Sequence, residues 1–374
     1  MSSTQLFCPN IECPARGQAE KNNISVHDQK KKRYICHVCE RTFSATKGTL
    51  FYRLRTEPKT VLLVIALLVY GCPVQAIVQA FGIDERTVRN WWQRAGIHCQ
   101  KFHERMLDQN QLELGQVQAD EIKAKTQKGS IWMAMAMMVS TRLWLGGAVS
   151  VNRDTSLLQE LAQQVRRIAL CRPLLIAVDG LNTYLSVFRD AFRSGIPRSK
   201  GQTGRMTLIE WPNILIVQVI KSKQAGVLNI KRVIVQGQAS VIEQIIRASQ
   251  GKGGINTAYI ERLNATFRQR LACLFRRTRF LARQSRTLQA SMYVLGCVYN
   301  FCDSHKSLRL RLSVGWLGFR WVQRTPALAA QLTDHRWSLE ELFTTKTPPP
   351  PWIKKQGRGR LPNRLLFRMS RYGI

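Results

Sequence analysis

The chain has 374 residues, of which 45% are hydrophobic, so it is long and apolar enough for two or three domains with buried cores. This composition excludes a disordered polycation. Lys and Arg number 57 against 23 Asp and Glu, a formal net charge of +34. Because such a surplus repels itself in a free protein, it indicates a polyanionic partner, either nucleic acid or an anionic membrane surface.

A membrane is the weaker of these two candidates. The longest apolar run, residues 61–72, is shorter than the roughly 20 residues that a spanning helix needs. The opening MSSTQLFCPN has neither the charged region nor the apolar region of a signal peptide. We therefore expect a cytoplasmic, nucleoid-associated protein with no membrane partner, in which the cysteines are reduced.

Two pairs of closely spaced cysteines lie near the start of the chain, and a short predicted hairpin separates them. Four thiolates arranged in this way are typical of a structural zinc site, and a ribbon of this size needs the metal to fold. Unrelated cysteines are the alternative interpretation. We predict a zinc ribbon over residues 1–55 with one structural Zn²⁺, and its ligands are Cys8, Cys13, Cys36 and Cys39.

Residues 60–96 have the spacing of a helix-turn-helix, with a glycine turn at Phe81 and Gly82 and with Asp84 capping the second helix. An αα-hairpin without DNA-binding function can look the same. The polar, basic outward face favours DNA binding within a domain at residues 56–110. The predicted DNA contacts on this helix are Arg86, Arg89, Asn90, Gln93 and Arg94.

The pattern then changes to three apolar strands joined by short turns, starting near residue 114. An amphipathic helix opened by a Thr or Ser cap, a buried strand ending at Asp179 and another helix follow, which is the order of a ribonuclease-H-like core. We interpret residues 195–230 as an insertion before the strand KRVIVQG. Two further helices complete the core, and a long basic helical region follows to about residue 330.

The predicted fold is therefore a multidomain α+β protein. A ribonuclease-H-like α/β catalytic core with three antiparallel strands plus parallel strands flanked by helices occupies residues 111–312. A basic helical C-terminal region and tail occupy residues 313–374.

Three carboxylates are placed to meet at the edge of this core. Asp120 lies in the first strand, Asp179 ends the buried strand, and Glu261 lies in the first turn of a helix that we expect Asn256 to cap. Neighbouring carboxylates repel unless they share a cation, and oxygen ligands select Mg²⁺ or Mn²⁺. Two such ions would suit phosphodiester chemistry. Arginines after Glu261 would hold the DNA strand, and we predict contacts by Arg262, Arg268, Arg270, Arg276 and Arg277.

Each acid also has an ordinary interpretation. Asp120 and Glu121 could be a solvated pair, Asp179 could belong to a turn, and Glu261 could neutralise Arg262 or favour the helix terminus. Glu121 is a substitute for Asp120, although its side chain is expected on the opposite face of the strand. The joint placement of the acids on the right elements favours the metal site.

The acidic motifs resemble those of the DDE transposases of bacterial insertion sequences, and they are most similar to the Insertion Sequence One type. The matching stretches are QADE at 118–121, AVDG at 177–180 and NTAYIERLNATFRQRL at 256–271, and YNFCDSHKSLR at 299–309 resembles the segment after them. The interval between the second and third acids is longer than in compact members of the family.

The resemblance implies that Asp120, Asp179 and Glu261 form a catalytic triad. It also implies that the protein binds the terminal inverted repeats of its element, cuts the DNA to free a 3′-hydroxyl and joins that hydroxyl to target DNA. A homodimer or larger assembly would hold two element ends together. The alternatives are a catalytically inert DNA-binding regulator and a ribonuclease-H-fold nuclease without strand transfer.

Overall fold

The computed structural model describes residues 6–19, 21–108, 110–196, 204, 206–224 and 227–349. The chain divides into two compact units. One unit combines Met1–Arg53 with Lys346–Ile374, and the other is Leu54–Thr345. Across the described residues, no helix has both the length and the apolar character that crossing a membrane requires.

The first unit contains a three-stranded antiparallel sheet in the order β1-β2-β3, with β1 at Ile24–Asp28, β2 at Arg33–Cys36 and β3 at Thr42–Ser44. Its small core consists of the buried Cys8, Cys13, Cys36, Ala15 and Phe43. Three of these five side chains are cysteines, so little apolar surface is available to stabilise the unit by burial alone.

Three helices open the second unit, namely α1 (Pro58–Val69), α2 (Val74–Phe81) and α3 (Glu85–Asp108). The predicted turn is present, because α2 ends at Gly82 in the left-handed conformation with φ of 63°. Asp84 accepts a hydrogen bond from the backbone N–H of Arg86 at 2.8 Å, as a capping residue should. Ile77 on α2 and Val88 on α3 are buried.

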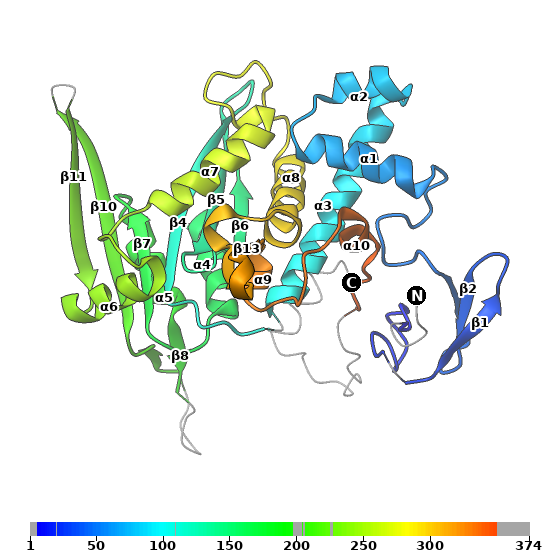
Figure 1. The fold of residues 1–374 in the computed structure, drawn as a ribbon, viewed down its shortest axis with the longest axis horizontal. Coiled ribbons are helices and arrows are strands. Elements are labelled where there is room, and N and C mark those ends of the chain that lie inside the picture. The colour runs from blue at the N-terminus through cyan, green and yellow to red at the C-terminus, as the bar shows by residue number, and fades with distance from the viewer. Residues whose placement is uncertain are drawn as a thin grey trace. The chain divides into compact units, whose positions relative to one another are not determined.

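A six-stranded mixed sheet forms the centre of the second unit, in the order β11-β10-β7-β4-β5-β6 (Figure 1). Strands β4, β5 and β6 are the predicted antiparallel meander, and β7 and β10 run parallel to β4. The strands are β4 (Gln116–Lys125), β5 (Ser130–Met138), β6 (Trp144–Ser150), β7 (Leu174–Asp179), β10 (Ile214–Gln224) and β11 (Val227–Gln236).

The prediction of an insertion over residues 195–230 was wrong in its extent. Its apolar run forms β10, a strand paired with β7 on one side and β11 on the other. The predicted core strand KRVIVQG is instead part of β11, an antiparallel edge strand. The sequence shows β10 only as one apolar run between lysine-rich segments. That pattern did not indicate that the strand is buried on both faces. The short pair β8 (Arg193–Gly195) and β9 (Leu208–Glu210) lies outside the central sheet in the described part of this region.

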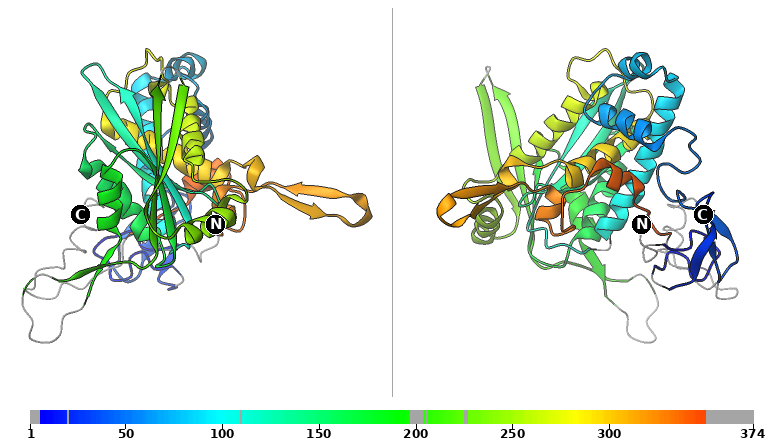
Figure 2. Two further views of the ribbon diagram at one scale, coloured as in Figure 1. Left: turned by 90° about the vertical axis from the view of Figure 1, so that its left-hand side faces the viewer. Right: turned by 45° about the vertical axis from the view of Figure 1, so that its right-hand side comes forward.

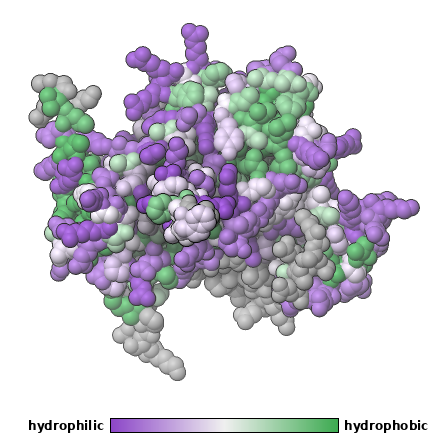
Figure 3. Space-filling view, viewed as in Figure 1, coloured by the Kyte–Doolittle hydropathy of each residue, from purple (hydrophilic) through white to green (hydrophobic). Residues whose placement is uncertain are grey.

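The outer strand β11 leaves apolar side chains in solvent, visible as green along one margin of the molecule in Figure 3. Val227 and Leu228 are among the most exposed large hydrophobic residues of the chain. Lys231 and Arg232 on the same strand place charge on this sheet edge, and charge at an edge opposes pairing with another chain.

Helices cover both faces of the sheet. Helix α6 (Ala239–Gln250) packs on Leu175, Ala177, Leu215 and Val217, and α7 (Ala258–Arg270) and α8 (Ser285–Cys297) lie on that same face. The opposite face carries α4 (Thr155–Ile168) and α5 (Thr183–Ala191). Asp154 caps α4 by accepting from the backbone N–H of Leu157, so the predicted Thr or Ser cap was wrong.

Helix α3 is fixed to the core through α8. A Cβ added to Gly96 would lie 2.3 Å from the Cβ of Ala290, so the two helices approach at a position where only glycine fits. Trp92 donates a hydrogen bond from its indole to the hydroxyl of Ser291 at 2.8 Å. The predicted helix-turn-helix therefore belongs to the same compact unit as the sheet.

The expectation of a helical C-terminal region was wrong for residues 310–322. After α8 and the π-helix Val298–Cys302, the chain forms a hairpin of β12 (Leu310–Ser313) and β13 (Phe319–Val322). Figure 2 shows this orange hairpin extending away from the rest of the second unit. Short helices α9 (Pro326–Ala329) and α10 (Leu339–Thr344) follow, and the predicted tail from residue 350 onward lies outside the described residues.

Candidate metal centres

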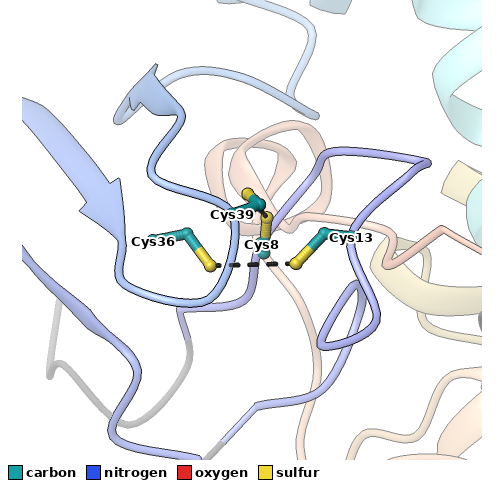
Figure 4. A group of neighbouring side chains, drawn as sticks. All are labelled: Cys8, Cys13, Cys36 and Cys39. Atoms are coloured by element: carbon teal, nitrogen blue, oxygen red, sulfur yellow. Dashed lines mark hydrogen bonds between the residues drawn. The ribbon is translucent and has the colours of Figure 1, made fainter.

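The four cysteines predicted as ligands do come together. Their sulfur atoms all lie within 4.8 Å of one another (Figure 4). The Sγ atoms of Cys8 and Cys39 are 3.6 Å apart, and those of Cys13 and Cys36 are 3.9 Å apart. Four sulfurs at about 2.3 Å from a central zinc would be separated by about 3.8 Å. The cluster therefore has the dimensions of a tetrahedral thiolate site and could hold one metal ion.

The four thiols differ in how readily they ionise, because burial raises the pKa of Cys8 and Cys13 whereas hydrogen-bond donors act on Cys39. Burial opposes ionisation of Cys39, but the side chain of Asn10 and the backbone of Arg41 donate hydrogen bonds that lower its pKa to about 7. Asn23 donates from its side-chain amide to the Sγ of Cys36 at 3.3 Å. A metal ligand must be the thiolate, so the donors to Cys39 favour the form that binds.

The register of the central sheet brings Asp120 and Asp179 together. Gln118 in β4 pairs with Ala177 in β7, and each aspartate lies two residues further along its strand. Side chains two residues apart share a face, so both aspartates lie on the face covered by α6 and α7. Their carboxylate oxygens belong to one group within 4.8 Å.

The third member of that group is Glu121, which the sequence had placed away from the site. Its strand position directs it to the opposite face, where Tyr184 of α5 donates to its Oε2 at 2.6 Å. Arg153 donates to its Oε1 at 2.6 Å. Because β4 and β7 stop pairing before the aspartates, the carboxylates from the two faces can meet beyond the last paired residues.

Glu261 lies outside the group of acids that a single ion could reach directly. It is in the first turn of α7, as expected. Thr257 directly precedes the helix, but the side-chain oxygen of Asn256 accepts from the backbone N–H of Ala258 at 3.0 Å. Its carboxylate accepts from the Thr257 hydroxyl at 2.7 Å and is paired with Lys221 of β10. The side chain of Glu261 is 46% exposed, whereas that of Glu121 is 2% exposed.

The start of α7 is anchored to the strand that bears Asp120. The side-chain oxygen of Gln118 accepts from the backbone N–H groups of Tyr259 and Ile260, each at 3.0 Å. The predicted apolar stripe is buried as expected, and it consists of Ile260, Leu263, Phe267 and Leu271. These contacts hold the first turn of α7 over the face of the sheet that carries both aspartates.

Burial and mutual repulsion raise the pKa of the two aspartates. Burial, followed by the charges of Glu121 and Asp179, raises the pKa of Asp120 to about 7. Glu261 adds to this rise in the pKa of Asp120, so its charge acts at the same place. Burial also raises the pKa of Asp179. Burial opposes ionisation of Glu261, but hydrogen bonds from Lys221 and Thr257 lower its pKa.

Sequence reasoning missed three polar neighbours of these acids. Asn264 donates to Asp120 Oδ2 at 2.7 Å, and it lies one helical turn after Glu261, a spacing that could have revealed it. Arg153 has its guanidinium 4.0 Å from Asp179 Oδ2 and stacks on Trp132. No sequence pattern pointed to Lys221 as a neighbour of the acids, because it lies in the stretch that we interpreted as an insertion.

The predicted DNA contacts differ in how accessible they are. On α3, Arg86, Arg89 and Asn90 are exposed, and Gln93 and Arg94 are half-buried. Arg262, Arg276 and Arg277 are exposed, and Arg268 is half-buried.

Arg270 is engaged inside the unit. It bonds Asp303 at 2.7 Å and stacks over the ring of Tyr70 at 4.9 Å. Tyr70 donates to the other oxygen of Asp303 at 2.9 Å. This network connects α1 to α7, so Arg270 has a structural role that the sequence did not indicate.

Histidines elsewhere also have contacts within the fold. His98 and His103 lie near the carbonyl oxygens of Leu342 and Trp144, at 2.9 and 3.4 Å. His305, in the stretch 299–309, packs edge-on against Tyr299 with ring centroids 4.5 Å apart. It lines a polar cleft of about 380 Å³ with Arg262, Arg336 and Tyr299.

A scan of protein families finds no family model that matches this chain, and no curated protein matches it either.

Proposed function

We propose that this protein is a DDE transposase of a bacterial insertion sequence. The observation that carries the proposal is the meeting of Asp120 and Asp179 on one face of the sheet, beneath the helix whose first turn bears Glu261. Acids from two strands and one helix are what a metal-dependent phosphodiester site requires.

The order of the strands supports a ribonuclease-H-like core. Three antiparallel strands, β6, β5 and β4, continue into the parallel strands β7 and β10, with helices on both faces. Asp179 ends β7, and sites collect at the carboxyl ends of strands in sheets flanked by helices, while Asp120 lies midway along the neighbouring β4. The edge strand β11 is an addition to that pattern.

Asp120, Asp179 and Glu261 would hold two Mg²⁺ or Mn²⁺ ions, which when bound activate a water or sugar hydroxyl and stabilise the leaving oxygen of a phosphodiester. Asn264 holds the carboxylate of Asp120 in place through its hydrogen bond. Thr257 does the same for Glu261. The exposed Arg262 on α7 would bind a DNA phosphate beside the acids.

Two further parts of the chain fit this role. The cysteine cluster would hold one structural Zn²⁺ ion. The exposed face of α3 would enter a major groove at the element ends. Two ends must be held together for strand transfer, so we propose a homodimer or larger assembly on double-stranded DNA.

The test is cleavage of labelled DNA carrying the terminal inverted repeats, with and without Mg²⁺. Asp179→Asn should abolish cleavage and leave DNA binding unchanged, because it removes a metal ligand and little else. Asp190→Asn is the matched control, since Asp190 is an exposed aspartate of α5 outside the acidic group, and it should cut normally. Normal cutting by Asp179→Asn would refute the catalytic assignment. Nicked products without joined products would favour a nuclease that lacks strand transfer.

A second candidate function is a catalytically inert DNA-binding regulator. The observation that favours it is the presence of two cationic side chains among the acids, Arg153 beside Glu121 and Asp179 and Lys221 beside Glu261. These cations neutralise the carboxylates in part without a metal ion. Absence of Mg²⁺ or Mn²⁺ binding to the wild-type protein would favour this candidate.

A further inference from the structure

The hairpin β12–β13 exposes an unusual amount of apolar surface for a free two-stranded element. Trp316 at its turn is 94% exposed, Phe319 is 60% exposed and Trp321 is 46% exposed. A two-stranded hairpin alone in water is marginally stable at best. Contiguous exposed apolar surface of this kind marks an interaction site.

One face of the hairpin alternates arginines with aromatic rings. Arg311 is directly opposite Trp321, and Ser313 is opposite Phe319. The guanidinium of Arg309 lies over the ring of Trp321 at 3.9 Å, and that of Arg311 lies over the ring of Phe319 at 3.2 Å. Stacking of this kind holds a guanidinium in a fixed plane and leaves its N–H groups at the edge free to donate.

The positive charge around the hairpin indicates which kind of partner it binds. Residues 304–333 contain five Lys or Arg and no Asp or Glu. In the described part of the chain, no hydrogen bond links the guanidinium of Arg309 or Arg311 to another residue. A second copy of the chain has the same +34 charge and would repel this arm, whereas a polyanion would be attracted.

We propose that the hairpin of β12 and β13 is a DNA-binding arm that lies in a groove of duplex DNA, with Arg309 and Arg311 donating to backbone phosphates. The major groove is about 12 Å wide and admits a two-stranded β-ribbon. Planar guanidinium groups match the oxygens of a phosphate in two parallel hydrogen bonds. The arm is separate from the predicted contacts on α3 and α7, so it adds a third DNA-contacting element.

The proposal shares with the proposed function only the ligand, and it is tested without catalysis. Affinity of the full zinc-loaded chain for a 30-bp duplex of arbitrary sequence is measured by fluorescence anisotropy over a range of salt, with no added Mg²⁺. Arg309→Ala combined with Arg311→Ala should weaken binding roughly tenfold. The slope of log affinity against log salt should fall by about 1.8, since about 0.9 is lost for each phosphate contact.

Two matched variants make this result specific. Arg247→Ala combined with Lys252→Ala removes the same charge from an exposed helix end and the loop after it, and it should change neither affinity nor slope by a comparable amount. Arg309→Lys combined with Arg311→Lys keeps the charge, so it should restore the slope while affinity stays below that of the wild type. Equal effects of the hairpin and control alanine pairs would overturn the proposal, because charge alone would explain them.

A photo-crosslink identifies the partner directly. Trp316→p-benzoylphenylalanine places a crosslinking group at the turn of the hairpin, and illumination with duplex DNA should give a protein–DNA adduct. A protein–protein adduct in place of the DNA adduct would overturn the proposal and identify the hairpin as a contact between copies. Neither measurement requires cleavage activity. A protein that fails to cut DNA can therefore still support or contradict the proposal for the hairpin.

Discussion

The cysteine cluster and the carboxylate group differ in how the chain builds them. The four cysteines lie within the first forty residues, two before the small sheet and two at the turn after β2, and three of them are buried in the core of the unit. The carboxylates come from two strands and a helix that are far apart in the sequence, with cationic side chains already among them. The first site is built from ligands close together in the sequence, whereas the second is partly neutralised by side chains of the protein itself.

This difference teaches which kind of site a sequence can reveal. Soft ligands paired at short spacing point toward one another wherever the local turn forms. Hard oxygen ligands on separate elements meet only if the sheet register and the helix packing bring them together. Four predictions test this contrast, and they are ordered from the largest expected effect to the smallest.

Loss of one cysteine should unfold the first unit. In Cys36→Ser, we expect bound zinc to fall from about one ion per chain to none, because a ribbon of this size lacks the core to fold without metal. Metal analysis by mass spectrometry and the exchange of backbone amides in residues 6–53 measure this effect. Cys171→Ser is the control, since Cys171 is exposed and outside the cluster. Retained zinc in Cys36→Ser would show that the cluster is not its site.

Substitution of Glu121 should mainly lower stability, and substitution of Glu261 should mainly weaken metal binding. Glu121→Gln weakens a buried network with Arg153 and Tyr184, and we expect it to lower the free energy of unfolding by about 1–3 kcal/mol. Glu261→Gln changes an exposed ion pair, so a loss below about 1 kcal/mol is expected, together with loss of Mn²⁺ binding. Urea denaturation and calorimetric Mn²⁺ titration measure these quantities.

Glu243→Gln on α6 is the control for both glutamates, because its carboxylate is exposed and outside the acidic group. If Glu121→Gln abolished Mn²⁺ binding while Glu261→Gln preserved it, the third ligand would be Glu121 and the predicted triad would be wrong.

The raised pKa of Asp120, about 7, makes the metal-free protein less stable as pH rises. The folded protein keeps a proton that the unfolded chain releases, so this stabilisation is complete below the ordinary aspartate pKa and is lost as pH rises toward 7. With no added divalent ion, Asp120→Asn should therefore be more stable than the wild type at pH 8, by about 1 kcal/mol or more, and should show a smaller difference at pH 4.5. Urea midpoints at the two pH values measure this. A larger difference at pH 4.5 would contradict the burial of Asp120 as an acid.

The smallest effect concerns the lysine that faces Glu261. Lys221→Met removes the ion pair and leaves the carboxylate free for a metal ion, so Mn²⁺ affinity without DNA should rise, by up to about fivefold for a pair worth about 1 kcal/mol. Isothermal titration with Mn²⁺ measures the change. Lys252→Met is the control, and weaker Mn²⁺ binding in Lys221→Met alone would show that Lys221 supports the site instead of competing for it.

The sequence predicted the individual elements well where hydrophobic periodicity was strong. The meander, the strand ending at Asp179 and the stripe on α7 were all visible, because alternation and helical spacing record which face is buried. It failed at β10 and at the hairpin β12–β13, where short apolar runs lie among basic residues. Short runs do not distinguish an insertion, a buried strand and an exposed hairpin, because their burial depends on distant partners.

By itself, the sequence determined the cysteine spacing, the glycine turn before α3, the position of Asp179 at a strand end and that of Asp120 within a strand. Only the tertiary structure decided which acids meet. The end of pairing between β4 and β7 lets Glu121 join the aspartates, and β10 brings Lys221 to Glu261. Local patterns fix the direction of a side chain on its own element. Its neighbours depend on strand register and on packing between elements that are far apart in the sequence.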